Sequence, residues 1–312
     1  MNSLSAKPSV SPKRSFRKDI RRFRLVYLML IPVLAYYIVF HYLPMGGVVI
    51  AFQNFKPAKG ILESDWVGFK NFAAFFNGPF AWRLIRNTLL LSVYQILFAF
   101  PAPILLAFLL NEMKDSPLKR VSQTLTYMPH FVSLVVICGI VRSFTNSTGV
   151  ITMAMGMFGI EAQNLLAKPE YYRPIYIISG IWQSIGWESI IYLATLATVD
   201  VSLFEAADLD GANRFQKIIH INLPALVPII AIQLIMRVGR IMSEGADKTI
   251  LLYSPIVYET ADLISSYVYR SGLEKMNYSS AAAIGLFNSF INMALVVFAN
   301  WFSRTHVNES LW

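Results

Sequence analysis

Six long apolar runs alternate with shorter polar stretches along this chain of 312 residues. The runs cover roughly residues 25–43, 87–110, 121–144, 175–198, 225–243 and 281–302. Each holds about the 20 predominantly apolar residues that a helix needs to cross the hydrocarbon core of a bilayer. The pattern therefore predicts an all-α integral membrane protein with six transmembrane helices.

The composition and the charge distribution agree with a membrane location. Charged residues make up 14% of the chain, whereas soluble domains carry about 25%. The net charge is +9, and eight of the 27 basic residues lie in the first 24 positions. They are Lys7, Lys13, Arg14, Arg17, Lys18, Arg21, Arg22 and Arg24. A basic segment before an apolar span marks the cytoplasmic side, so both termini of a six-span chain are expected there.

This orientation assigns each polar segment between the runs to one side of the membrane. Residues 1–24 lack apolar periodicity, which predicts a disordered basic tail that can touch anionic lipid headgroups. The basic residues are not interleaved with aromatic ones, which argues against nucleic-acid binding. The other segments expected in the cytoplasm are 111–120, 199–224 and 303–312, which ends in a C-terminal tail at 306–312.

Two long loops are expected on the outer side of the membrane. Loop 44–86 is rich in aromatic side chains that favour short helices at the headgroup level. These side chains include Trp66, Phe69, Phe72 and Trp82. Loop 145–174 contains ITMAMGMFGI, and ten apolar residues are too few to span, so we expect a re-entrant or surface helix.

The sequence offers no metal site. The single cysteine, Cys138, lies inside an apolar run, so neither an internal disulfide nor a cysteine-based metal site is possible. The four histidines lie far apart in the sequence, and such residues are more often structural than metal ligands. They are His41, His130, His220 and His306.

Catalytic motifs are also absent, so no catalytic residue is expected. GADKT at 245–249 has Asp247 where a phosphate-binding loop needs its second glycine, so the chain cannot hydrolyse ATP alone. Asp208-Leu-Asp210 resembles the D-x-D that holds a divalent metal in nucleotide-sugar transferases. A membrane glycosyltransferase is therefore one alternative for the function.

A polar patch, EAADLDGANRFQKIIHINLP at 205–224, interrupts the apolar runs. Ser202 and Glu205 have the S-x-x-E spacing of a capping box, which predicts a short helix over 203–210. Gly211 is the residue type that ends helices in the left-handed conformation.

A second helix is then expected over 212–221, with Pro224 in the first turn of the next span, where its missing N–H costs little. The patch therefore predicts a helix–turn–helix that lies on the cytoplasmic face of the membrane.

The spacing within this patch resembles the EAA loop of the permease subunits of ATP-binding-cassette importers. The matching residues are Glu205, Ala206, Ala207, Gly211, Ala212, Ile221, Leu223 and Pro224. The resemblance implies a permease core over about 85–305 with its coupling loop at 200–224, preceded by a first transmembrane helix and external loop at 25–84. YLPMGGVVIAFQNFKP, WVGFKNF and LLYSPIVYETADLISSYVYRSGL further resemble the polysaccharide-type sugar permeases.

This resemblance implies a transporter subunit in the bacterial cytoplasmic (inner) membrane and not an enzyme. The implied partners are a second permease subunit, a cytoplasmic ATPase dimer that holds ATP and Mg, and an extracytoplasmic solute-binding protein; this chain itself would need no cofactor. The implied cargo is an oligosaccharide or polysaccharide. A peptide or a lipid-linked sugar is the alternative cargo, and a secondary transporter is disfavoured because no internal inverted repeat is visible.

The resemblance also implies roles for residues of the patch. The short helix before Gly211 would dock in a groove of the ATPase, with small side chains allowing close approach and Glu205 pairing with a basic group. The residues implied in this coupling are Glu205, Ala206, Ala207, Asp208, Gly211 and Ala212.

Two polar stripes within the apolar runs are candidates for the substrate path, because polar groups inside a span usually face a cavity or a partner. The first follows one helix face and consists of Tyr176, Gly180, Gln183 and Trp187, flanked by Trp182 and Glu188. Aromatic faces and amides suit the C–H patches and hydroxyls of a sugar. Ordinary helix packing is the alternative explanation.

The second stripe consists of Gln233, Arg237, Arg240 and Glu244. An arginine at the bilayer centre costs about 2.5–3.5 kcal/mol on insertion scales, so two of them need water, a carboxylate or an anionic ligand. One interpretation pairs Arg240 with Glu244 at i, i+4. The other is that Arg237 and Arg240 hold an acidic oligosaccharide.

Overall fold

The computed structural model describes residues 23–243 and 245–306; residues 1–22 of the expected tail at 1–24, Glu244 and the C-terminal residues 307–312 lie outside the described residues. Within them, five helical stretches are long and apolar enough to cross a membrane: Arg24–Phe52, Ala81–Glu112, Leu134–Gly156, Arg214–Val238 and Tyr278–Thr305. A bent pair, α10 (Pro169–Leu196) and α11 (Val201–Leu209), supplies a sixth candidate. The all-α membrane fold is thus confirmed.

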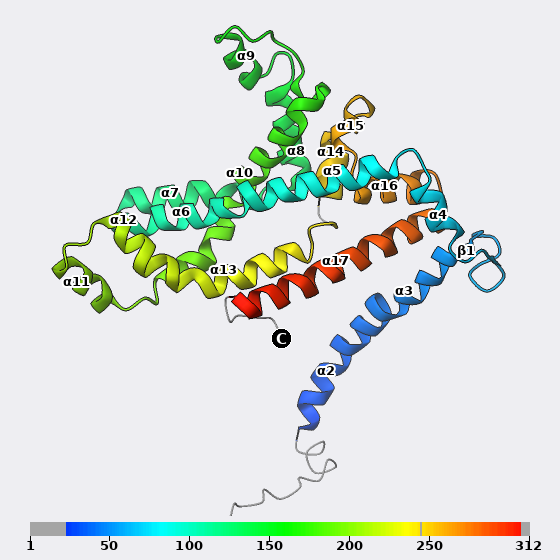
Figure 1. Ribbon diagram of the computed structural model, residues 1–312, viewed down its shortest axis with the longest axis horizontal. Coiled ribbons are helices and arrows are strands. Elements are labelled where there is room, and N and C mark those ends of the chain that lie inside the picture. The colour runs from blue at the N-terminus through cyan, green and yellow to red at the C-terminus, as the bar shows by residue number, and fades with distance from the viewer. Residues whose placement is uncertain (1–22, 244, 307–312) are drawn as a thin grey trace, which may run out of the picture.

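The first span is longer than its apolar run suggests. It comprises α2 (Arg24–Tyr37), η1 (Ile38–Tyr42), α3 (Leu43–Met45) and η2 (Gly46–Phe52), so the following loop begins at Gln53 and not at residue 44. No side chain of α2 is buried. Figure 1 shows why, because α2 and α3 diverge from the other helices.

The loop after this span contains a short antiparallel pair, β1 (Gln53–Asn54) and β2 (Asp65–Trp66), which the sequence pattern did not predict. Trp66 stacks on Phe52 with ring centroids 5.7 Å apart. One short helix follows, α4 (Lys70–Phe76), in keeping with the expected helical turns of this loop.

The second span is one long helical stretch. It contains α5 (Ala81–Tyr94), η3 (Gln95–Ala99) and α6 (Pro101–Glu112). Trp82, expected in the external loop, lies in the first turn of α5 with its side chain exposed.

The expected third span at 121–144 is wrong. α7 (Pro117–Tyr127) passes into η4 (Met128–Phe131), the backbone becomes extended at Val132 and Ser133, and a new helix, α8 (Leu134–Thr145), begins. The break has a local cause, because Ser133 acts as the N-cap and its hydroxyl accepts from the Val136 amide at 3.4 Å. The membrane candidate starts at Leu134.

A short helix forms within the expected loop 145–174, where a re-entrant or surface helix was predicted. It is α9 (Val150–Gly156), whose seven residues are too few to span alone. Together, α8 and α9 make up the candidate stretch Leu134–Gly156.

α10 is the centre of the bundle and contacts α6, α7, α8, α13 and α15. The turn η5 (Leu165–Ala167) precedes it. Its buried aromatic side chains include Tyr172, Tyr176 and Tyr192. The other elements are α12 (Arg214–Lys217), η6 (Ile218–Asn222), α13 (Leu223–Val238), α14 (Ala246–Leu252), η7 (Pro255–Val257), α15 (Tyr258–Ala261), α16 (Ile264–Tyr269), η8 (Arg270–Glu274) and α17 (Tyr278–His306).

A buried carboxylate ties the segment between the last two spans to the bundle. Asp262 is fully buried and accepts from Arg83 of α5 at 3.2 Å and from Arg270 of η8 at 2.8 Å. Asn87, also fully buried, donates to the carbonyl oxygens of Glu259 and Asp262. These contacts fasten α15 and η8 against α5.

Candidate functional site

The polar patch at 200–224 forms a projecting element at one end of the molecule. None of the residues of α11 is buried, and large apolar side chains such as Leu203 and Leu209 are exposed. Figure 1 shows α11 and α12 at the opposite end from β1 and α4. A short helix with exposed apolar side chains and two alanines is suited to a partner's groove.

The cap of α11 differs from the expected one. Its N-cap is Asp200, whose carboxylate accepts from the Ser202 amide at 2.9 Å, so the predicted capping box of Ser202 and Glu205 is wrong. The hydrogen bond from the Ser202 amide also lowers the pKa of Asp200 below its ordinary value. The helix therefore starts and ends slightly earlier than the predicted 203–210.

The turn after α11 is as expected. Gly211 has φ +74°, the left-handed region that favours glycine. The Ala212 amide donates to the Ala207 carbonyl at 2.9 Å, and the Gly211 amide donates to the Asp208 carbonyl at 3.1 Å. The side chain of Lys217 also donates to the Asp208 carboxylate, which adds an ion pair between α11 and α12.

The expected separate helix at 212–221 is wrong. Asn213 and Gln216 form a capping box with hydrogen bonds of 2.8 and 2.9 Å, and the helix that begins there continues without interruption to Val238. The wider π-helical turn η6 lies just before Pro224 and carries the helix past it. The second arm of the patch is thus the start of the fifth span.

A cavity of about 310 Å³ lies between α10 and α13. Its lining residues are Phe100, Trp187, Glu188, Ile191, Tyr192, Gln233, Arg237 and Arg240. This volume is at the lower end of the range of about 300–1,000 Å³ for ligand pockets. Three of the four residues of the second predicted stripe line it, and Trp187 of the first stripe joins them.

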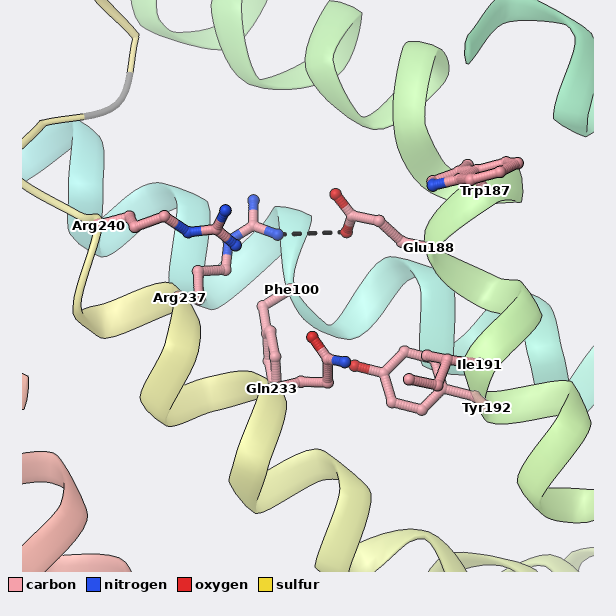
Figure 2. Close-up of a pocket in the computed structure, with 8 residues that line it drawn as sticks. All are labelled: Phe100, Trp187, Glu188, Ile191, Tyr192, Gln233, Arg237 and Arg240. Atoms are coloured by element: carbon pink, nitrogen blue, oxygen red, sulfur yellow. Dashed lines mark hydrogen bonds and ion pairs between the residues drawn. The ribbon is translucent and has the colours of Figure 1, made fainter. Parts of the chain in front are cut away.

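The central contact of the cavity is an ion pair between its two walls. Figure 2 shows Arg237 of α13 and Glu188 of α10 pointing toward each other, with Nη1 of Arg237 3.2 Å from Oε2 of Glu188. Both side chains keep partial exposure, 20% for Arg237 and 36% for Glu188. The alternative pairing of Arg240 with Glu244 concerns a residue outside the described part of the chain.

Two predicted residues lie elsewhere. Tyr176 is buried in the core, where the ammonium of Lys248 lies 4.5 Å from the centre of its ring, and Gln183 does not line the cavity. Trp187 reaches the cavity while its ring stacks on His130 with centroids 4.6 Å apart. Of the first stripe, Tyr176 therefore belongs to the packed core, whereas Trp187 lines the cavity.

Glu188 was expected only to flank the first stripe, and no role was predicted for Phe100, Ile191 or Tyr192. A charge inside a span is itself a signal for a cavity, and this could have identified Glu188. The aromatic and aliphatic residues carry no such signal. No group of three or more His, Cys, Asp or Glu side chains that could hold a metal ion exists among the described residues.

Comparisons with known proteins agree with this architecture. The model of the family described as "Binding-protein-dependent transport system inner membrane component" matches residues 99–306. Protein LplB of Bacillus subtilis is 40% identical over 96% of this chain and 94% of its own length. The polygalacturonan/rhamnogalacturonan transport system permease protein YteP of the same organism is 39% identical, with the same coverage of both chains.

Solved structures extend the similarity to the fold. A chain of a bacterial ABC transporter involved in the import of the acidic polysaccharide alginate is 42% identical, with a TM-score of 0.87 over 93% of this chain and 98% of that one. A bacterial alginate ABC transporter in complex with its alginate pentasaccharide-bound periplasmic protein gives 40% identity and a TM-score of 0.88, over 96% of this chain and all of that one.

The relatives and solved structures cover more than nine tenths of the chain, and with the family model they identify a membrane permease component of a transporter and not an enzyme such as the glycosyltransferase considered above. The chain belongs to the family of inner membrane components of binding-protein-dependent transport systems.

Proposed function

We propose that this chain is a transmembrane subunit of an ATP-driven importer for acidic oligosaccharides in the bacterial cytoplasmic membrane. The observation that carries the proposal is the convergence of Arg237 and Arg240 with Trp187, Tyr192 and Gln233 on one cavity between α10 and α13. A second permease subunit, a solute-binding protein and membrane lipid complete its surroundings.

The cavity offers both kinds of contact that an acidic sugar needs. Guanidinium groups bind carboxylates with directional, charge-assisted hydrogen bonds. The faces of aromatic side chains such as Trp187 and Tyr192 can cover the apolar C–H patches of a sugar ring. The amide of Gln233 can donate to and accept from hydroxyl groups.

The relatives support the same class of cargo. YteP is described as a polygalacturonan/rhamnogalacturonan transport system permease, and the solved relative imports alginate, an acidic polysaccharide. A peptide or a lipid-linked sugar would also need a polar cavity. Neither explains two arginines beside aromatic side chains as directly as a uronate does.

The energy for transport comes from a partner. In our proposal, α11 docks on a cytoplasmic ATPase that holds ATP and Mg, and this chain contributes no cofactor. Glu205 is exposed and available to a basic group, and Ala206 and Ala207 allow close approach. Asp208, Gly211 and Ala212 fix the turn behind α11 through the hydrogen bonds and the ion pair described above.

The test uses the reconstituted complex of permeases, ATPase and solute-binding protein. Arg237→Gln and Arg240→Gln should each weaken the response of ATP hydrolysis to an acidic oligosaccharide, while a neutral oligosaccharide of equal length is affected much less. A charge-assisted hydrogen bond contributes about 1.5–3 kcal/mol, so the loss is expected to be tenfold or more.

Arg120→Gln is the control, because Arg120 is an exposed arginine on α7 outside the cavity. Thermal stability is measured in parallel. Equal losses with acidic and neutral sugars that follow lost stability would overturn the acidic-sugar proposal.

A further inference from the structure

We propose that Glu188 is a displaceable counter-ion of Arg237, which a substrate carboxylate replaces when the sugar enters the cavity. Glu188 is then a specificity-determining residue, because an anionic ligand enters only if it binds Arg237 more strongly than the Glu188 carboxylate does. This inference rests on the proposed function of the cavity and adds the way in which the empty site is neutralised.

The first observation is that Arg237 is incompletely satisfied. Its guanidinium carries five N–H donors, and the structure shows one hydrogen bond, from Nη1 to Oε2 of Glu188. Its Nε is buried and has no hydrogen-bond partner in the described structure. A buried donor without a partner is costly in a folded protein. Nε of Arg83 and of Arg173 is also unpaired, but of these three arginines only Arg237 lines the cavity, where a ligand can supply the acceptor.

The second observation is that Glu188 holds Arg237 weakly. The contact uses a single carboxylate oxygen at 3.2 Å, whereas strong arginine–carboxylate pairs use two parallel hydrogen bonds. About a third of the Glu188 side chain remains exposed. When displaced, this carboxylate can therefore turn to water without being left buried and unpaired, which would be the main obstacle to displacement.

The third observation is that a ligand carboxylate can accept two hydrogen bonds from Arg237, whereas Glu188 accepts one. Figure 2 shows Glu188 approaching the Arg237 guanidinium from the α10 wall through one of its terminal nitrogens. A carboxylate that approached along the other edge would accept from Nε and from a terminal nitrogen at once. The exchange replaces one hydrogen bond with two and satisfies the buried Nε, so it favours anionic sugars over neutral ones.

The position of the pair links recognition to the coupling loop. Glu188 lies on α10, which bends by 75° into α11, and Arg237 lies on the helix that begins at Arg214, just after Gly211. The ion pair therefore ties together the two helices that enter and leave the coupling loop. Its replacement by a sugar removes a tie between these helices at the moment when the cavity fills.

The experiment measures binding of trigalacturonate, and of a neutral trisaccharide as the comparison, to the purified complex without solute-binding protein by isothermal titration calorimetry. Glu188→Gln should bind trigalacturonate about tenfold more tightly than the parent, because the competing charge is gone. Binding of the neutral sugar should change by less than about twofold. Glu170→Gln is the matched control, since Glu170 is an exposed glutamate in the first turn of the same helix, outside the cavity.

The double variant shows through which residue Glu188 acts. In an Arg237→Gln background, Glu188→Gln should have no effect on trigalacturonate binding, because the counter-ion has nothing left to neutralise. If Glu188→Gln does not assemble, Glu188→Ala makes the same prediction with a smaller side chain.

Two outcomes separate the inference from the function on which it rests. Parent-like or weaker trigalacturonate binding by Glu188→Gln, with Arg237→Gln still selectively impaired, overturns the counter-ion and leaves the proposed function intact. If Arg237→Gln binds both trigalacturonate and the neutral trisaccharide as tightly as the parent does, the proposed function is overturned.

Discussion

Lys248 of α14 lies against Tyr176 of α10, with its Nζ donating to the Tyr176 carbonyl at 2.8 Å and 4.5 Å from the centre of the ring. Gly180 leaves room for this contact, because a Cβ there would come within 3.1 Å of the ammonium nitrogen, closer than ordinary van der Waals contact. Within the described residues, Lys248 has no carboxylate within ion-pair distance. A buried ammonium thus fastens the segment after the fifth span to the central helix.

This burial predicts an unusual pH dependence of stability. Burial lowers the pKa of Lys248 from 10.5 to about 8. Below pH 8 the folded chain bears the cost of burying the charge. Between pH 8 and 10.5 the folded chain has lost this proton while the unfolded chain keeps it, so stability rises with pH. By pH 9.5 the gain should be about 2 kcal/mol relative to pH 7.

The measurement compares the melting temperatures of the parent and Lys248→Met in detergent at pH 7 and pH 9.5. The melting temperature of the parent should increase relative to that of Lys248→Met as the pH rises. Lys168→Met is the control, because Lys168 is exposed. A constant difference between parent and Lys248→Met at both pH values would contradict a buried, partly neutralised lysine.

Gly211→Val should leave the protein in the membrane but weaken its binding to the ATPase. Gly211 has φ +74°, and β-branched residues strongly disfavour this region, at a cost of about 1–3 kcal/mol. Gly211→Asn is the matched variant, because asparagine tolerates the left-handed conformation and should retain binding. Recovery of the ATPase in a pull-down decides between the two, and equal recovery with valine and asparagine would argue against docking through this turn.

Asp262→Ala should destabilise the fold strongly. The carboxylate is fully buried between Arg83 and Arg270, so its removal leaves two guanidinium groups without their partner. Breaking a buried ion pair typically costs about 3–5 kcal/mol. Asp115→Ala provides the comparison, because the pair of Asp115 with Lys119 is exposed and should contribute less than about 1 kcal/mol. Thermal unfolding of both variants checks this, and similar losses would refute the role of Asp262.

The apolar runs predicted the membrane fold because hydrocarbon imposes a length and a composition on each span. The same pattern failed between residues 121 and 144, because its first part, in α7, is mostly polar and Ser133 caps a new, apolar helix within it. Apolar character does not report where a backbone hydrogen bond is broken. Short polar residues inside the run carried that information.

The structure of the loop at 200–224 was predicted in part because its signals are local. Gly211 marked the turn correctly, since its positive φ depends on residues close to it in the sequence. Ser202 was a plausible cap, yet Asp200 two residues earlier took the role, and both choices satisfy the same local rule. The continuity of the following helix past Pro224 depended on η6, which helical periodicity does not reveal.

Most of the cavity residues that were predicted from the sequence lie on one wall of the cavity, the α13 side. Arg237 and Gln233 were identified by charge and spacing within a span, and both line it. The pairing of Arg237 with Glu188 joins residues 49 positions apart and depends on the packing of α10 against α13. Spacing along one helix could not supply it. Tyr176 shares a helix face with Trp187 but lies in the core, because different helices cover the two ends of that face.

The helix from Arg214 to Val238 runs without a break from the turn after α11 to the cavity, and it therefore has the geometry of a lever. Arg214 and Arg237 lie on one helical rod, and at 1.5 Å per residue their separation along it is about 35 Å. A tilt of about 5° about the end at Arg214 would displace the guanidinium end by about 3 Å. That displacement is comparable to the 3.2 Å length of the contact with Glu188, so a small tilt of this helix would be enough to open or close the ion pair in the cavity.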